Sequence, residues 1–239
     1  MKQDDKLNPE QKTTRLMKEV QEALGLEKLP VIIECFDNSN IQGSDAVAAC
    51  VVFRKLKPSK NDYRKYNIKS VEGPDDYASM REVVGRRYRR ITEEGGELPS
   101  VIFADGGKGQ MDAIIGVVKG ELGLDIPVLG LVKNSRHKTS EVITENGNVI
   151  GLKQGTMLFR LLSQIQDEVH RFAITFHREK RSKRQTASEL DNIKGIGEKT
   201  KQLLLNHFKS VKRIKEARIE DITAVVGKSK AEIIFNAFR

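Results

Sequence analysis

The spacing of apolar residues along the chain alternates between the two-residue period of a strand and the longer period of a helix. Runs rich in β-branched, aromatic or other apolar residues predict five strands: 31–37, 46–54, 63–70, 100–105 and 127–132. Gly43 and Pro58 lie in the links between the first three, which favours successive antiparallel strands. A helical pattern separates the last two, which predicts a parallel strand–helix–strand unit. A hairpin is expected over 142–152.

Helical spacing combined with capping residues predicts three long helices. The first is expected to begin at Pro9, with Asn8 as its N-cap. The second follows Asp75 or Asp76, either of which can cap it, and ends at a pair of glycines. The third begins near Thr156 and carries a continuous apolar stripe.

These elements predict an α/β domain followed by a small all-α domain. After the third helix, the segment 178–188 is basic and shows no helical period, so we expect a linker there. From Glu189 the chain contains two similar halves, each an apolar residue, a glycine turn and an amphipathic helix, with a period of about 30 residues. We expect a leading helical segment that packs on the α/β domain, then that domain, the linker and the helical domain, with these boundaries: 1–29, 30–180, 181–188 and 189–239.

Composition excludes several classes of protein. Apolar residues make up 38% of the 239 residues, which is sufficient for a buried core. The longest apolar run, 46–53, is too short to span a membrane, and the polar start of the chain lacks the core of a signal peptide. Cys35 and Cys50 lie in strand-like runs, so neither a disulfide framework nor a cysteine zinc site is expected. We therefore expect a cytoplasmic protein with no membrane partner.

The charge of the chain is unevenly distributed. The sequence has a net charge of +9, but the last 62 residues hold 16 basic and only 8 acidic side chains. A compact basic segment favours a polyanionic partner, most often nucleic acid. The alternative is a solvated basic face with no partner.

Two aspartates occupy matching positions in the strand pattern. Asp37 and Asp105 each end an apolar strand, and by strand parity they share faces with Cys35 and Phe103. Open α/β sheets place their sites at the carboxyl ends of such strands. If the two strands are parallel neighbours, the carboxylates converge and repel each other, and a divalent cation with oxygen ligands relieves the repulsion. The alternative for each aspartate is a helix N-cap or a loop hydrogen bond.

His170 is a third candidate, because it lies on the long helix beside the apolar stripe. Its imidazole suits either ligation of Mg²⁺ or Mn²⁺ or general acid–base catalysis; the alternative is a histidine that is hydrogen-bonded at the edge of the core. Asp76 is a weaker candidate, because capping a helix accounts for it. The glycine-rich segment 106–109 favours a tight turn beside Asp105, with Lys108 directed into the same cleft.

The two glycine turns near the C-terminus predict an anion-binding surface. A glycine turn exposes backbone N–H groups near a helix N-terminus, and nearby lysines add positive charge. Such a module binds the nucleic-acid backbone without reading sequence, with strong salt dependence. The alternative is an ordinary helical hairpin with glycine caps. The residues that we expect to bind DNA are Lys108, Gly195, Gly197, Lys199, Thr200, Lys201, Gly227, Lys228, Ser229 and Lys230.

Four stretches, in this order, resemble the C-terminal half of the UvrC family. They are ECFDNS from Glu34 with Gln42 and Gly43 beyond it, DDYA from Asp75, DGGKGQ from Asp105 and DEVHRFA from Asp167. UvrC is the nuclease subunit of the bacterial UvrABC nucleotide excision repair system, and the match covers about residues 10–239. The resemblance implies an RNase H-like domain, with a mixed sheet and flanking helices, followed by tandem helix-hairpin-helix motifs.

The resemblance also implies roles for individual residues. By family motif, Asp37, Asp105 and His170 form the catalytic set and hold Mg²⁺ or Mn²⁺, and Asp76 is a further acidic position implicated in incision. The family hydrolyses a phosphodiester 5′ to a lesion in double-stranded DNA after UvrB, with UvrA upstream in the pathway, has marked the site. Near the cleft, several arginines of the second helix are expected to hold the DNA backbone: Arg81, Arg86, Arg87, Arg89 and Arg90.

The sequence departs from the family pattern at a few positions and leaves alternatives open. Ser229 stands where the second hairpin glycine is expected, and Asn38 and Asn40 vary the first motif. The family's N-terminal nuclease and its UvrB-contacting segment have no counterpart in this sequence, so we expect a fragment of a longer protein. A non-catalytic DNA-binding scaffold remains one alternative. Another RNase H-like structure-specific nuclease, such as a junction resolvase or transposase, is the second.

Overall fold

The computed structural model describes residues 8–39, 46–71, 73, 75–134 and 139–238. These residues form two compact units, Met1–Phe176 and His177–Arg239. Within the described ranges, no helix has the length and apolar character needed to cross a membrane.

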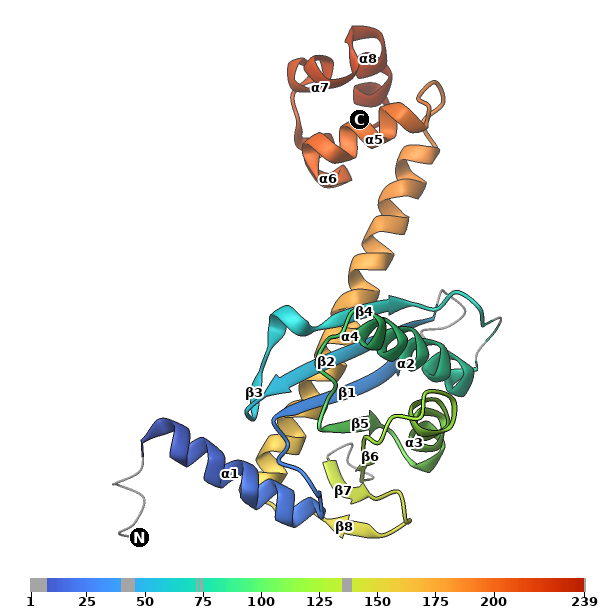
Figure 1. Cartoon of the computed structure of the whole chain (residues 1–239). Helices are drawn as coiled ribbons and strands as arrows, with labels where there is room; N and C mark the ends of the chain where they lie inside the picture. The colour runs from blue at the N-terminus through green and yellow to red at the C-terminus, as the bar shows by residue number, and fades with distance from the viewer. Residues whose placement is uncertain (1–7, 40–45, 72, 74, 135–138, 239) are drawn as a thin grey trace. The chain divides into compact units, whose positions relative to one another are not determined.

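The first unit is built on one mixed sheet of eight strands. Neighbouring strands follow the order β3-β2-β1-β5-β6-β7-β8, and β4 also pairs with β2 (Figure 1). The pairs β1–β5 and β5–β6 are parallel, and the remaining pairs are antiparallel. The strands are β1 (Ile32–Ser39), β2 (Val47–Arg54), β3 (Lys57–Pro58), β4 (Arg64–Asn67), β5 (Val101–Asp105), β6 (Val128–Lys133), β7 (Thr139–Ile143) and β8 (Val149–Gly151).

This topology confirms the predicted order of strands. β1, β2 and β4 are the three antiparallel strands, and a short 3₁₀ turn (Lys60–Asp62) precedes β4. β5, α3 (Lys108–Ile115) and β6 form the parallel strand–helix–strand unit, in which α3 continues into a π-helical segment (Gly116–Glu121). β7 and β8 form the expected hairpin.

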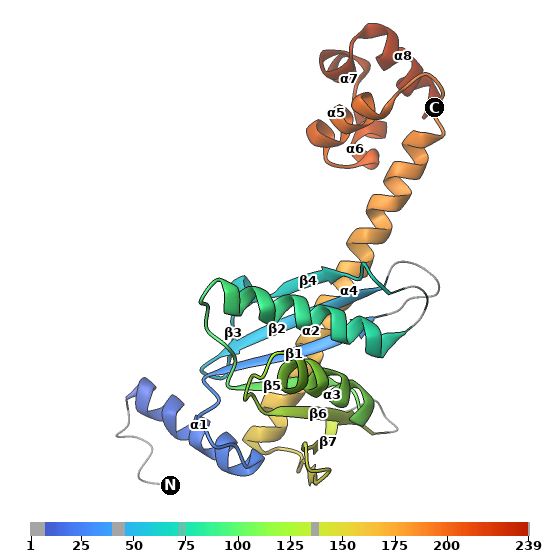
Figure 2. The same ribbon diagram turned by 45° about the vertical axis from the view of Figure 1, so that its right-hand side comes forward.

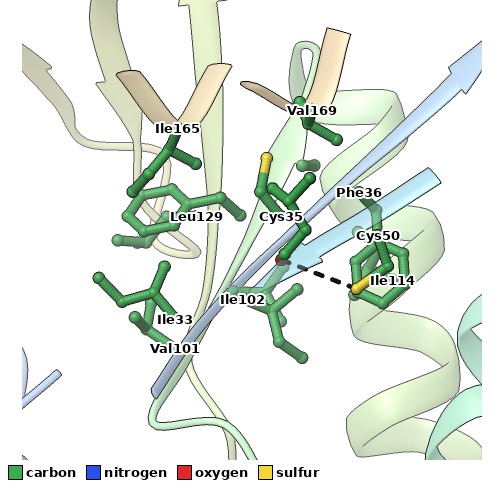
Figure 3. Close-up of a cluster of buried hydrophobic side chains, with 14 of the residues drawn as sticks. Ile33, Cys35, Phe36, Cys50, Val101, Ile102, Ile114, Leu129, Ile165 and Val169 are labelled. Atoms are coloured by element: carbon green, nitrogen blue, oxygen red, sulfur yellow. Dashed lines mark hydrogen bonds between the residues drawn. The ribbon is translucent and has the colours of Figure 1, made fainter. Parts of the chain in front are cut away.

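Helices cover both faces of the sheet, as Figure 2 shows. α2 (Asp76–Glu93) and α3 lie on one face, and the first part of α4 (Met157–Asp191) lies on the other. Because alternate strand residues point to opposite faces, Ile33 and Cys35 pack toward Ile165 and Val169 of α4, whereas Phe36 points to the helices opposite (Figure 3). Both cysteines are buried in this core as free thiols.

The N-terminal helix α1 (Pro9–Leu24) has the predicted caps. The Asn8 side chain accepts a hydrogen bond from the backbone N–H of Gln11, and the Gln11 side chain accepts one from the N–H of Asn8, which completes a capping box. Gly25 ends the helix with a φ of 65°, the left-handed conformation that glycine adopts readily. Buried Val20 and Leu24 attach α1 to the core of the first unit.

The segment that we expected as a linker is helical. α4 runs without interruption to Asp191, so it includes 181–188, and the boundary between the two units falls inside it. The segment contains neither glycine nor proline and is rich in arginine, lysine and glutamine, all of which favour helix. The lost apolar period therefore did not mark irregular chain, because residues with high helix propensity continue the helix there.

The second unit is wholly helical and has its own core. α5 (Glu198–Phe208), α6 (Val211–Glu216), α7 (Ile219–Val226) and α8 (Lys228–Ala237) follow the end of α4. Both predicted glycine turns lie directly before a helix, at α5 and at α8. The buried hydrophobic residues of this core are Leu190, Ile193, Ile196, Leu204, Val211, Ile214, Ile222, Ala231 and Ile234.

Candidate active site

Two carboxylates lie side by side where the parallel pairing of β1 with β5 ends, although β1 itself runs on to Ser39 and not only to Asp37 as expected. β1 and β5 pair in parallel with Phe36 opposite Ala104, so the next residues along, Asp37 and Asp105, are neighbours on the face that α4 covers. The condition set by the sequence pattern, that these strands be parallel neighbours, is therefore met. Only 11% of the Asp37 side chain and 5% of the Asp105 side chain are exposed.

His170 reaches the same place from α4. Asp37, Asp105 and His170 each offer one ligand atom, and these atoms all lie within 4.8 Å of one another. His170 Nδ1 is 3.6 Å from Asp37 Oδ2, which is too long for a hydrogen bond. The histidine side chain is 57% exposed, so the cluster is open to solvent on the side of the imidazole.

The proximity of the two carboxylates changes the acidity of Asp37. Its pKa is raised to about 7, first because the group is buried and second because the Asp105 charge lies beside it. The Lys133 ammonium opposes this rise in the pKa of Asp37, whereas the more distant charge of Asp76 adds to it. Burial and the neighbouring carboxylate thus both favour the protonated form of Asp37 in the metal-free cluster.

Sequence reasoning missed two residues that hold Asp105. Lys133, at the end of β6, places its Nζ 3.2 Å from Asp105 Oδ2, and a register shift between Val132 and Lys133 marks a bulge there. Gln166, on α4, donates a hydrogen bond from Nε2 to Asp105 Oδ1, and Thr139 of β7 donates one to Gln166 Oε1. Both oxygens of Asp105 are therefore engaged by residues from other elements.

The cluster lies in a hollow of about 450 Å³ at the carboxyl ends of β1, β5 and β6. The lining residues are Asp37, Asn38, Asp105, Gly106, Gly107, Leu131, Val132, Lys133 and His170. Gly106 has a φ of 157°, and a Cβ on it would approach Gln110 Cγ to 2.8 Å. The glycines after Asp105 thus make the tight turn that the sequence predicted.

Asp76 lies at the first turn of α2, near the cluster but outside it. The N-cap is Asp75, whose carboxylate accepts a hydrogen bond from the N–H of Ala78. Asn38 donates from Nδ2 to the backbone carbonyl oxygen of Asp76 at 2.6 Å, which ties the start of α2 to the end of β1. Lys108 is exposed at the start of α3 and does not line the hollow; the ammonium found there belongs to Lys133.

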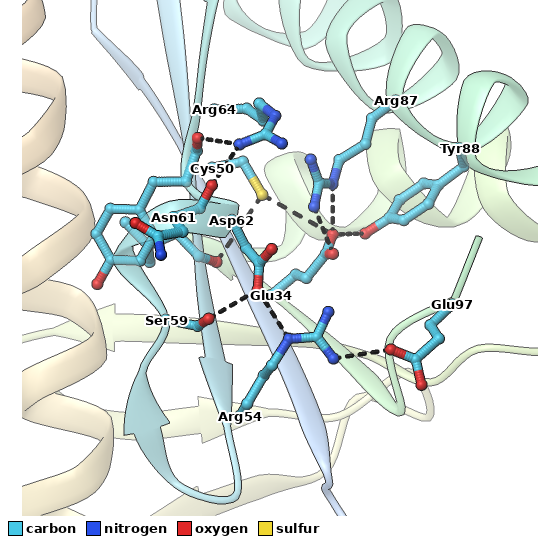
Figure 4. Close-up of polar contacts among 12 residues, drawn as sticks. Glu34, Cys50, Arg54, Ser59, Asn61, Asp62, Arg64, Arg87, Tyr88 and Glu97 are labelled. Atoms are coloured by element: carbon cyan, nitrogen blue, oxygen red, sulfur yellow. Dashed lines mark hydrogen bonds and ion pairs between the residues drawn. The ribbon is translucent and has the colours of Figure 1, made fainter. Parts of the chain in front are cut away.

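The expectation that the α2 arginines hold DNA is wrong for Arg87. Arg87 is buried and donates from Nη2 and Nε to both carboxylate oxygens of Glu34, at 2.6 and 2.7 Å (Figure 4). Tyr88 donates to the same carboxylate. The other paired arginines of the helix contact acids of their own unit: Arg86 with Glu82, Arg89 with Glu121 and Arg90 with Glu94.

The residues of the first C-terminal glycine turn divide into exposed and buried groups. Gly195 has a φ of 97°. A Cβ added at this position would lie 3.2 Å from the side chain of Ile233 in the second half. Gly197 is the N-cap of α5, and Lys199 is exposed in the first turn. Thr200 is buried.

Lysines in the two turns have different surroundings. Lys201, beside Thr200 on α5, pairs with Asp191. Gly227, with a φ of 84°, is the N-cap of α8, and Lys228, Ser229 and Lys230 follow exposed in the first turn of that helix. The second turn thus has the same placement as the first, at the N-terminus of a helix.

Comparison with protein families gives a match for each unit. Residues 21–174 match the model described as the UvrC RNase H endonuclease domain. Residues 187–239 match a SAM-like helix-hairpin-helix tandem. Among solved structures, the match to human endonuclease V covers 71% of this chain and 98% of the endonuclease chain, with 10% identity and a TM-score of 0.38. The match to an endonuclease V from Streptomyces avermitilis covers 73% of this chain and 96% of that endonuclease chain, with 12% identity and a TM-score of 0.37.

Relatives with high identity share one name, UvrABC system protein C. The Bacteroides fragilis protein is 68% identical over 98% of this chain, and the Porphyromonas gingivalis protein is 48% identical over the whole of this chain. This chain spans 38% and 40% of those relatives. The RNase H-like sheet, the helix-hairpin-helix tandem and this identity agree, and the chain therefore belongs to the UvrC family.

Proposed function

We propose that this chain carries a divalent-metal-dependent endonuclease site that hydrolyses a phosphodiester of damaged DNA on the 5′ side of the lesion. The observation that carries the proposal is the convergence of Asp37, Asp105 and His170 in one solvent-accessible hollow. Membership of the UvrC family supplies the reaction class, because the matched segment is an endonuclease domain.

The residues of the cluster fit Mg²⁺ or Mn²⁺. Two carboxylate oxygens and one imidazole nitrogen within 4.8 Å of one another are ligands that these ions accept. The raised pKa of Asp37 reports burial and repulsion between the carboxylates, and a cation relieves that repulsion. When bound, such an ion polarises a phosphodiester oxygen and lowers the pKa of a coordinated water.

The chain's own residues have separate tasks under this proposal. Asp37 and Asp105 supply the negative charge that holds the ion. His170, exposed at the mouth of the hollow, is either a further ligand or the base that accepts a proton from the attacking water. The Mn²⁺ affinity of the His170→Ala variant separates these two roles. The affinity falls if His170 is a metal ligand, and it is retained if His170 acts only as the base.

DNA binding is assigned to the second unit. The glycine turns before α5 and α8 present backbone N–H groups at helix N-termini, beside exposed Lys199, Lys228 and Lys230. These groups bind phosphates without reading bases, so the module holds duplex DNA regardless of sequence. We assign UvrB as the partner that presents the lesion, with UvrA upstream, on the ground that the relatives are named as part of the UvrABC system.

A nicking assay tests the proposal. A duplex with one lesion is incubated with UvrA, UvrB and this chain, with Mg²⁺, Mn²⁺ or EDTA. We expect a metal-dependent cut 5′ to the lesion that Asp37→Ala and His170→Ala lose while DNA affinity is retained. Asp112→Ala, an exposed aspartate of α3, is the matched control and should cut normally.

Two results would contradict the proposal. DNA binding without a cut, by this chain supplemented with the remaining part of a full-length relative, would indicate a non-catalytic scaffold. A cut without UvrB at a structural junction would indicate a different RNase H-like nuclease.

A further inference from the structure

Two consecutive hydrogen bonds, from Thr139 to Gln166 and from Gln166 to Asp105, end on the Asp105 carboxylate. Thr139 of β7 and Gln166 of α4 are both buried, with 6% and 2% exposure. The Thr139 hydroxyl donates to Gln166 Oε1, and Gln166 Nε2 donates to Asp105 Oδ1. Gln166 lies one helical turn before His170, so the same helix supplies a member of the cluster and a group that contacts it.

The direction of these hydrogen bonds is fixed by chemistry. An ionised carboxylate only accepts hydrogen bonds, so it selects the Gln166 orientation in which the NH₂ group faces Asp105. The opposite amide orientation would place a carbonyl oxygen against the carboxylate. Gln166 Oε1 is then directed to Thr139, whose hydroxyl donates to it.

The two oxygens of Asp105 have different partners. Gln166 donates to Oδ1, whereas Oδ2 lies 3.2 Å from the ammonium of Lys133, which lines the hollow. Rotation of the carboxylate about its bond to Cβ would break the contact with Gln166. The hydrogen bond thus restricts the carboxylate to one orientation before any ion arrives.

We propose that Gln166, itself oriented by Thr139, is a positioning residue that fixes the Asp105 carboxylate for divalent-metal binding. The proposal rests on the function proposed above. Groups that orient metal ligands in this way typically change metal affinity by about 10- to 100-fold when they are removed. A purely structural role, which ties α4 to β5 and β7, would instead change stability and leave metal affinity unaffected.

Mn²⁺ binding by the whole chain tests the proposal without any need for activity. Free Mn²⁺ is measured by its electron paramagnetic resonance signal as the protein is titrated. We expect Gln166→Met, which keeps the side-chain length but not the amide, to bind Mn²⁺ about 10- to 100-fold more weakly. Gln164→Met is the matched control, because Gln164 is exposed on the same helix, and it should bind like the wild type.

A second pair of variants isolates the hydroxyl. Thr139→Val keeps the shape of the side chain and removes the donor, so we expect weaker Mn²⁺ binding. Thr139→Ser restores the hydroxyl and should restore the affinity. Circular dichroism in EDTA shows whether Gln166→Met folds. If it does not fold, Thr139→Val and Thr139→Ser alone test the positioning role.

Asp105→Asn separates the two proposals. If Asp105→Asn loses Mn²⁺ while Gln166→Met and Thr139→Val bind as the wild type does, the positioning role is wrong and the metal site stands. If Asp105→Asn also binds Mn²⁺ normally, the metal site itself is wrong, and the proposed function fails with it.

Discussion

The Asp37 carboxyl predicts an unusual pH dependence of stability in the metal-free protein. Burial and the adjacent Asp105 raise its pKa from 3.8 to about 7. In the unfolded chain the pKa of Asp37 returns to 3.8. Between about pH 4 and pH 7, the folded protein therefore binds the Asp37 proton more tightly than the unfolded chain does. The resulting stabilisation is fully present below about pH 4 and is lost as the pH rises through about 7.

The magnitude follows from the size of the shift. At about 1.4 kcal/mol per pKa unit, the shift corresponds to about 4 kcal/mol, which is the upper limit of the effect. Asp37→Asn removes the titrating group while preserving its shape. In EDTA at pH 8 we therefore expect Asp37→Asn to be more stable than the wild type by up to that amount, with the difference shrinking toward pH 4.

Thermal unfolding followed by circular dichroism, in EDTA across this pH range, measures the difference. For a unit of this size, each 1 kcal/mol shifts the melting temperature by about 2–4 °C, so the expected gap at pH 8 is on the order of 10 °C. Asp112→Asn controls for the loss of a surface charge. Equal melting temperatures of wild type and Asp37→Asn at pH 8, or a gap independent of pH, would refute the assigned cause of the shift.

Two further predictions concern charges that the sequence alone does not distinguish. Arg87→Ala leaves the buried Glu34 carboxylate unpaired, so we expect a loss of about 3–5 kcal/mol in the free energy of unfolding, measured by urea denaturation. Arg90→Ala on the exposed face of the same helix should barely change it, and equal losses would contradict the assignment. In the second unit, Lys199→Gln should reduce the slope of log DNA affinity against log salt concentration by about 1. Lys201→Gln should reduce it less, because Lys201 pairs with Asp191, and the reverse order would refute this difference.

The sequence predicted the rows of buried residues that carry the two aspartates because their pattern is local, although β1 runs two residues beyond the expected end, to Ser39. Asp37 and Asp105 each extend a row of buried residues with period two, and parallel pairing of β1 and β5 then brings them together. Lys133 and Gln166 were missed because their contacts with Asp105 join β6 and α4 to β5. Gln166 nevertheless lies on the apolar stripe between Leu162 and Val169, and a polar residue in such a stripe was the available signal.

A polar residue at a core position of the sequence pattern would also have distinguished Arg87 from the other arginines of α2. Arg87 follows Val83 and Val84 at helical spacing, and Glu34 stands inside an apolar strand. Each is an isolated charge at a core position, and the burial of either charge without a partner is unfavourable. Two buried charges of opposite sign are therefore expected to form an ion pair with each other. A list of the basic residues on the helix does not show this.

Internal pairing of the arginines also explains how charge is divided between the two units. In residues 31–177 the 20 basic and 19 acidic side chains nearly balance, and in α2 the pairs of Arg86, Arg87, Arg89 and Arg90 form within the unit itself. Nearly all of the surplus lies beyond residue 177, about half of it in residues 178–188 of α4 and half in residues 189–239, which contain the glycine turns. Under the proposed function, the electrostatic attraction for DNA therefore arises mainly in the second unit, while the first unit contributes the cut. Salt added to the reaction should then raise the DNA concentration needed for half-maximal cutting and leave the rate at saturating DNA nearly unchanged, because the buried carboxylates are screened far less than exposed lysines.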